Sequence, residues 1–173
     1  TVDLFGLPAD HDRINCIAAD HGLFVLEDAA QGFGGEVNGR RAGTLAEVGC
    51  TSFFPAKPLG CYGDGGALFT NDDNLAALFR SIRVHGRGVD KYENVRLGIT
   101  GRLDALQAAV LIPKLSIFSD ELNSRQRAAL TYEKLISSSN LDIITPEVPD
   151  GYCSAWAQYS ILAPNQIGRQ SLL

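Results

Sequence analysis

The sequence predicts an α/β fold built around a parallel sheet, and two features lead to this prediction. A strand-like run, a helix and a second strand follow one another within residues 1–28. This order is typical of a βαβ unit, whose crossover is right-handed. The second strand, at 23–26, is a continuous apolar run, as expected for a strand that is buried on both faces of a parallel sheet.

The first βαβ unit is predicted in detail from its apolar spacing and its end signals. Its first strand covers residues 2–5, and its helix begins near Asp10 and ends at Gly22. The apolar face of that helix recurs at i, i+3, i+4 and i+7, at Ile14, Ile17, Ala18 and His21.

Alternating strands, turns and helices are predicted for the next part of the chain. In order, they are a glycine-rich loop or hairpin at 32–43, a third strand at 50–54, a fourth strand at 66–70, a turn and cap at 71–73, a helix at 74–84 and an exposed loop at 86–101. The helix carries one apolar face and breaks at Gly86.

A long helical segment at 102–137 follows, and Pro113 is predicted to kink or divide it. Its apolar stripe begins with Leu103, Leu106 and Val110. Strands at 141–145 and 155–162, with a loop between them, are predicted to begin a second, smaller α+β unit. The long helix would therefore link two domains.

Composition argues against several classes of partner. At 173 residues and 45% hydrophobic, the chain can bury one ordinary core. Its formal charge is −5, and its basic residues are scattered, so nucleic acid and anionic membranes are not expected partners. No apolar run is long enough for a membrane span, and residues 1–20 do not read as a secretion signal. We therefore expect a cytoplasmic protein.

The four cysteines are predicted to be reduced thiols. They are widely separated and contain no CxxC pair, which argues against a disulfide frame and against a metal site. Both ends of the chain are predicted to be internal to a longer protein. There is no methionine, the chain opens on a strand-like run, and residues 171–173 read as the first turns of a helix.

Asp28 is the first candidate functional residue, because it falls where the buried strand ends. In open α/β sheets ligands bind outside the carboxyl ends of the strands. The simpler alternative is an aspartate that caps the following turn. Position alone does not separate the two.

Lys57 is the second candidate, just beyond the third strand in the apolar, proline-bound stretch 52–60. A partly desolvated lysine titrates lower and can act as a Schiff-base nucleophile. The alternative is an ordinary surface lysine. Glycines at 60, 63, 65 and 66 follow, and such runs either cradle a phosphate or simply form turns.

Taken together, these residues have the requirements of a pyridoxal phosphate site. An acid can hold a pyridine nitrogen protonated, a lysine can form the Schiff base, and Ser52 can bind the phosphate. At these positions the sequence resembles the DegT/DnrJ/EryC1/StrS family of sugar aminotransferases. The matching segments, in family order, are Glu27-Asp28-Ala29-Ala30-Gln31, Ser52 to Lys57, Gly63-Asp64-Gly65-Gly66, His85-Gly86 and Gly98 to Arg102.

The resemblance implies a role for each matched residue. Lys57 would form the internal aldimine with pyridoxal 5'-phosphate and then shuttle protons. Asp28 would pair with the pyridinium nitrogen, Gln31 would contact the ring or its 3-hydroxyl, and Ser52 would bind the phosphate. Because some family members carry histidine at the lysine position and catalyse deoxygenation, Lys57 indicates transamination.

The resemblance also implies a fold, a substrate and an assembly. Residues 1–112 would be the second half of the large three-layer α/β/α domain of an aspartate-aminotransferase-like fold, and 113–173 the linking helix and the start of the small C-terminal domain. The substrate would be a UDP-linked 3-keto or 4-keto N-acetylated sugar or uronate for cell-surface polysaccharide, with glutamate as amino donor. The active unit would be a homodimer.

Two departures from the family pattern stand out. The family's G-x-N-x-R asparagine, which reaches the cofactor phosphate of the neighbouring subunit, is Thr100 here, and threonine is shorter. Family members also begin far upstream of Thr1 and continue past Leu173. The chain is therefore predicted to be a fragment.

Two alternatives remain open from the sequence. One is an inactive fragment of such an enzyme that binds no cofactor on its own. The other is a different α/β nucleotide-binding enzyme, against which the lack of a strand-GxGxxG-helix unit counts.

Overall fold

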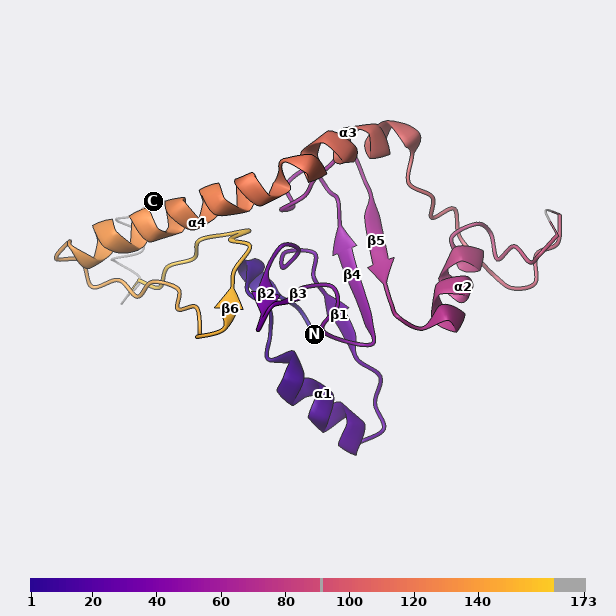
Figure 1. The fold of residues 1–173 in the computed structure, drawn as a ribbon, viewed down its shortest axis with the longest axis horizontal. Helices are drawn as coiled ribbons and strands as arrows, with labels where there is room; N and C mark the ends of the chain where they lie inside the picture. Colours follow the sequence, from indigo (N-terminus) through magenta and orange to yellow (C-terminus); the bar gives the residue numbers. More distant parts are fainter. Residues whose placement is uncertain (91, 164–173) are drawn as a thin grey trace.

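A central sheet forms the middle of the chain in the computed structural model, which describes residues 1–90 and 92–163 (Figure 1). Its strands are β1 (Leu26–Asp28), β4 (Val48–Ser52) and β5 (Gly66–Phe69), hydrogen-bonded in the order β1-β4-β5. β1 and β4 are parallel, and β5 runs antiparallel to β4. Val2 adds a parallel bridge to Asp28. The predicted α/β class and the parallel first pair are confirmed.

The first crossover follows the prediction closely. Helix α1 (His11–Asp20) is preceded by Asp10, whose side chain accepts a hydrogen bond from the Arg13 N–H. The predicted first strand is shorter than expected, because residues Leu4–Gly6 form a 3₁₀ turn. Only the start of that segment pairs with β1.

The prediction that residues 23–26 form a strand buried on both faces is wrong. Strand β1 begins only at Leu26, and the side chains of Leu23, Phe24 and Leu26 are exposed by 64%, 56% and 45%. The physical reason is that α3 and α4 form their core with the segment that follows β4, so they do not cover Leu23, Phe24 and Leu26. An apolar run does not reveal which of its sides is covered.

A small second sheet joins distant parts of the chain. The hairpin β2 (Glu36–Val37) and β3 (Arg40–Arg41) lies within the predicted loop or hairpin, and β6 (Tyr152–Cys153) pairs antiparallel with β2. The predicted strands at 141–145 and 155–162 are wrong, since only a single bridge, Ile144 to Leu162, forms there. The division into two domains at residue 112 remains a prediction.

The helices on the C-terminal side are α2 (Asp73–Ile82), α3 (Ala105–Ser116) and α4 (Phe118–Ser137). α3 and α4 lie end to end and run across the end of the sheet at which β4 ends (Figure 1). The break between them is at Ile117, not at Pro113 as predicted. Pro113 is accommodated inside α3 because Ala109, whose carbonyl loses its hydrogen bond, is exposed to water.

The main core lies between these helices and the segment that follows β4. Leu59, Cys61, Leu111 and Phe118 are buried there, and Phe33, Phe53 and Leu103 pack against them. Leu106, predicted to belong to the apolar stripe, is instead 80% exposed. The core therefore fixes the position of the chain immediately after β4, where Lys57 lies.

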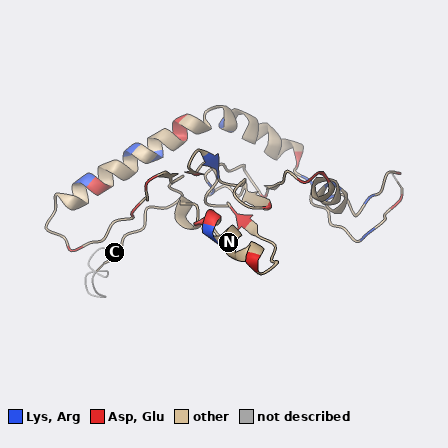
Figure 2. Cartoon of the chain, turned by 60° about the horizontal axis from the view of Figure 1, so that its bottom comes forward, with Lys and Arg blue, Asp and Glu red and all other residues tan. Residues whose placement is uncertain are grey.

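The remaining predictions concern charge, membranes and the chain end. Acidic and basic residues alternate along α4 without a continuous basic stripe (Figure 2). Among the described residues no helix meets the length and apolarity needed to cross a membrane. The predicted helix at 171–173 lies outside the described residues.

Candidate functional site

Two of the predicted site residues end neighbouring parallel strands. Asp28 is the last residue of β1 and Ser52 the last of β4, and Asp28 is aligned with Cys50 in the register. Aligned residues share a face of a sheet, and so do residues two apart on one strand. Asp28, Cys50 and Ser52 therefore lie on one face of the sheet, near its carboxyl edge.

Asp28 is half-buried and keeps one oxygen available. The Ala30 N–H donates to its Oδ1 at 3.0 Å, as the turn-capping alternative requires. The pKa of the neighbouring Cys50 thiol is raised, first by burial and then by the charges of Asp28 and Glu27. The Asp28 carboxylate thus lies near the Cys50 thiol.

Ser52 and Lys57 are joined by a tight turn. The Phe54 N–H donates to Ser52 Oγ at 3.2 Å, and the Lys57 N–H donates to the Phe54 carbonyl at 2.9 Å. At Gly60 a side chain would meet the carbonyl oxygens of Pro55 and Phe54 at 2.6 and 2.8 Å, so glycine is needed to close the turn.

The Lys57 side chain is half-buried, and its Nζ has no hydrogen bond or ion pair with any other described residue. Lys57 lines a cavity of about 520 Å³ together with Lys114, Asp120 and Arg125 of the α3–α4 side. Asp28, Gln31 and Ser52 do not line that cavity. The structure therefore brings Asp28 and Ser52 to one edge of the sheet, whereas Lys57, which follows Ser52 in the sequence, lines a cavity on the α3–α4 side.

Gln31 is held by the end of the first strand. The Phe5 N–H donates to its Oε1 at 2.6 Å. Because Phe5 follows the segment that pairs in parallel with β1, this contact lies at the carboxyl edge beside Asp28. Gln31 therefore belongs to the same edge.

Thr100 lies apart from the other predicted residues. It is exposed, forms an antiparallel bridge with Val84, and its Oγ1 is 3.4 Å from His85 Nδ1. Its segment follows α2 and extends away from the sheet (Figure 1). Within one chain, the structure does not bring Thr100 to the strand ends.

A buried polar cluster was missed by the sequence reasoning. Asp3, His11 and Glu27 are each at most 2% exposed, and their ligand atoms lie within 4.8 Å of one another. His11 Nε2 is 2.9 Å from Asp3 Oδ1, while both Glu27 oxygens accept backbone N–H groups, from Gly43 and Leu45. Both Glu27 oxygens are thus occupied, but Asp3 Oδ2 and His11 Nδ1 have no hydrogen-bond partner in the described part of the chain, so the cluster is only partly satisfied.

The stability of the protein should fall as pH rises because of Glu27. Burial, reinforced by the Asp3 charge, raises the pKa of Glu27 above 4.5, although the hydrogen bonds from Gly43 and Leu45 oppose this. The folded state therefore binds this proton more tightly than the unfolded state does. The resulting stabilisation is complete below about pH 4.5 and is lost as pH rises through the raised pKa, by at most about 1.4 kcal/mol per pH unit.

Denaturant unfolding at a series of pH values checks this expectation. Glu27→Gln cannot ionise, so its free energy of unfolding should lack this falling component. The matched control is Glu47→Gln, at an exposed position. Parallel pH profiles for unsubstituted protein and Glu27→Gln would contradict the assignment.

Comparison with known proteins identifies the family of this chain. The sequence model of the DegT/DnrJ/EryC1/StrS aminotransferase family matches residues 1–173. A relative in Pseudomonas aeruginosa, UDP-2-acetamido-2-deoxy-3-oxo-D-glucuronate aminotransferase, is 48% identical over 99% of this chain and 47% of its own length. A Geobacillus stearothermophilus relative named pleiotropic regulatory protein is 43% identical over 99% of this chain and 46% of its own length.

A solved structure confirms the fold class. The crystal structure of a DegT DnrJ EryC1 StrS aminotransferase from Brucella abortus has a TM-score of 0.92 at 52% identity, covering 98% of this chain and 45% of that one. The chain spans about half the length of the relatives it matches. The family match is inconsistent with the alternative of a different α/β nucleotide-binding enzyme.

Proposed function

The chain belongs to the DegT/DnrJ/EryC1/StrS aminotransferase family, and we propose that the protein containing it uses pyridoxal 5'-phosphate to aminate a keto group on a nucleotide-linked sugar. The observation that carries this proposal is the shared edge of β1 and β4, where Asp28 and Ser52 lie on one face and Lys57 follows Ser52. The Pseudomonas aeruginosa relative, whose name specifies a 3-oxo uronate aminotransferase, supports this reading over an inactive fragment.

The residues at this edge fit the cofactor because each of them has a hydrogen-bonding group that no other described residue uses. Asp28 Oδ1 is used by Ala30, which leaves Oδ2 for a protonated ring nitrogen. Ser52 Oγ accepts from Phe54, so its O–H remains free to donate to a phosphate. Gln31 Oε1 is used by Phe5, which leaves its Nε2 as a donor toward the ring or its 3-hydroxyl.

When bound, the cofactor supplies an electron sink for the amino-group transfer. Lys57 Nζ would hold the cofactor covalently and, once an incoming amine has displaced it, would move a proton to or from the carbon that gains or loses the amino group. Asp28 keeps the ring nitrogen protonated, because a carboxylate next to a pyridine favours its charged form. Ser52 and Gln31 fix the phosphate and the ring in place.

The substrate we propose is a UDP-linked 3-keto or 4-keto N-acetylated sugar or uronate used for cell-surface polysaccharide, with glutamate as the amino donor. The free thiols of Cys16, Cys50, Cys61 and Cys153 agree with the cytoplasm as its location. Borohydride reduction followed by peptide mapping tests the cofactor assignment. A cofactor-modified peptide containing Lys57 supports it, and modification at another lysine alone contradicts it.

We expect assembly into a two-fold homodimer through the loop that follows α2. Val89 and Leu97 of this loop are 104% and 97% exposed, so it presents apolar surface without packing it in its own chain. In a dimer, Thr100 on this loop would approach the cofactor phosphate of the partner subunit. Each site would then be built from both subunits.

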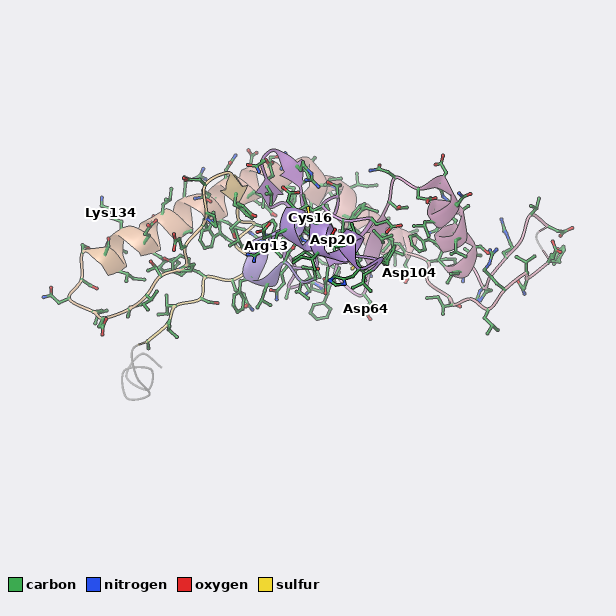
Figure 3. All side chains as sticks on the ribbon, turned by 90° about the horizontal axis from the view of Figure 1, so that it is seen from below. Arg13, Cys16, Asp20, Asp64, Asp104 and Lys134 are labelled. Atoms are coloured by element: carbon green, nitrogen blue, oxygen red, sulfur yellow. The ribbon has the colours of Figure 1, made fainter. Side chains whose placement is uncertain are left out.

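Leu97→Asp is expected to weaken this dimer. A charge placed in an apolar contact should raise the dimer dissociation constant by at least about tenfold. Sedimentation velocity over a range of concentrations measures this in the full-length protein, with Lys134→Glu as the charge-changing control, because Lys134 projects from the ribbon in Figure 3. An unchanged dissociation constant for Leu97→Asp would place the interface elsewhere.

A further inference from the structure

The Phe5–Gly6 turn, at the carboxyl edge of the sheet, is hydrogen-bonded to a segment that lies about 150 residues later in the sequence. Phe5 and Gly6, which end the first strand segment, both have left-handed backbone, with φ of 62° and 108°. The Ala155 N–H donates to the Gly6 carbonyl at 2.8 Å, and the Gln158 N–H donates to the Phe5 carbonyl at 3.1 Å. Residues 155–158 therefore hold both carbonyls of this turn.

The contact between the two segments is too close for any side chain at Gly6. A Cβ there would lie 2.7 Å from the backbone nitrogens of both Trp156 and Ala157. Ala155 is completely buried, and Trp156 is itself left-handed, with φ of 49°. The left-handed backbone at Trp156 thus packs against the left-handed turn at Phe5 and Gly6. Residues other than glycine keep such a conformation only where the surrounding contacts impose it.

Segment 155–158 is in turn anchored on α4. The Trp156 Nε1–H donates to Gln126 Oε1 at 2.7 Å. The Tyr159 ring contacts those of Trp156 and Tyr132, with centroid separations of 5.5 and 5.2 Å. A series of contacts therefore connects α4, through Trp156, to the Phe5–Gly6 turn.

The last contact in this series is made by the side-chain amide of Gln31. The Phe5 N–H is fixed by the turn and donates to Gln31 Oε1 at 2.6 Å. An amide whose oxygen is held in this way presents its Nε2 hydrogens in the other direction. If the Phe5 N–H were displaced, the amide would lose the contact that distinguishes its oxygen from its nitrogen.

We propose that residues 155–158 are a positioning element of the active site, which acts through the Phe5–Gly6 turn to aim the Gln31 Nε2 donor at the cofactor. This inference rests on the proposed function, because it assumes that Gln31 faces the ring hydroxyl. It adds that a segment beyond α4 sets the orientation of a residue on the β1 side. None of residues 155–158 needs to touch the cofactor.

The pH dependence of the absorption spectrum of the bound cofactor tests this proposal. A donor to the ring hydroxyl stabilises its deprotonated form, so losing that donor raises the pH midpoint of the spectral change, by about one unit for one charge-assisted hydrogen bond. Gly6→Ala in the full-length protein should produce this rise, because the new methyl group displaces the turn. Gln31→Ala should produce the same rise.

The matched control is Gly22→Ala. Gly22 also has positive φ, 61°, but a Cβ there meets no atom within 4 Å, so its substitution introduces backbone strain without displacing a neighbour. Its midpoint should not move. Adding Gly6→Ala to Gln31→Ala should give no further shift, because both changes remove the same donor.

A second variant keeps the test decisive if Gly6→Ala does not fold. Gln126→Ala, at an exposed position on α4, removes only the acceptor of the Trp156 indole, and it should raise the midpoint in the same direction. Unchanged midpoints, or additive shifts in the double variant, would overturn the positioning role. No cofactor absorption in the unsubstituted protein would instead overturn the proposed function, and this inference with it.

Discussion

Lys57→Ala is expected to abolish covalent trapping of the cofactor and to lower turnover by about 10⁴-fold or more, because the substitution removes both the nucleophile and the proton carrier. The side chain has no described partner whose loss could account for such an effect by unfolding the turn. The turn itself is held by the Lys57 backbone N–H and by Gly60, and both remain in the variant. The measurement is turnover of a UDP-linked keto sugar by the full-length protein, together with borohydride trapping.

Two lysine variants serve as controls for this experiment. Lys134→Ala removes a lysine at the far end of α4 and should leave both readouts unchanged (Figure 3). Lys114→Ala removes the side chain that donates to the Gly60 carbonyl at 2.5 Å, so it tests whether loosening the turn is enough to lower activity. Substantial turnover in Lys57→Ala would show that another residue holds the cofactor.

Features that depend on neighbouring residues were predictable from the sequence. Asp10 caps α1 and the helix ends before Gly22, as the sequence signals indicated. The strand at 66–70 was placed to within a residue. Such signals need only a few adjacent residues to act, so no knowledge of the rest of the fold is required.

Features that depend on distant contacts were not predictable. The apolar run at 23–26 suggested a strand buried on both faces, yet Leu23, Phe24 and Leu26 are exposed, because the core of α3 and α4 forms against the segment after β4. The same holds for the cluster of Asp3, His11 and Glu27, whose members come from three different elements. A single polar residue in each of those segments gives no sign of the other two.

The candidate site shows both kinds of information. Asp28 was found because it ends a predicted strand, and Ser52 because it opens the Ser52 to Lys57 segment; the parallel pairing of β1 and β4 brings both to one edge. The fixing of the Gln31 amide by Phe5 could not be found in the same way. It depends on a left-handed turn that residues 155–158 impose, and nothing near Gln31 in the sequence encodes it.

Asp28→Asn should keep the cofactor bound but lower the turnover number by about 10²–10³-fold, the usual cost of losing one preorganised electrostatic contact. Asparagine retains an oxygen that can accept the Ala30 N–H, so the turn after β1 should survive the change. It cannot carry the negative charge that favours a protonated ring nitrogen. The loss should therefore appear in the rate of the chemical step and not in cofactor affinity.

Single-turnover kinetics combined with a cofactor-binding titration separates these two effects for Asp28→Asn. Asp20→Asn provides the matched control, because Asp20 is an exposed aspartate at the end of α1, and both of its readouts should equal those of the unsubstituted protein. A variant that lost its cofactor but regained full turnover at saturating cofactor would show that Asp28 contributes to binding alone. A variant with unchanged rate and affinity would leave Asp28 as the cap of its turn, because the Ala30 hydrogen bond is then its whole role.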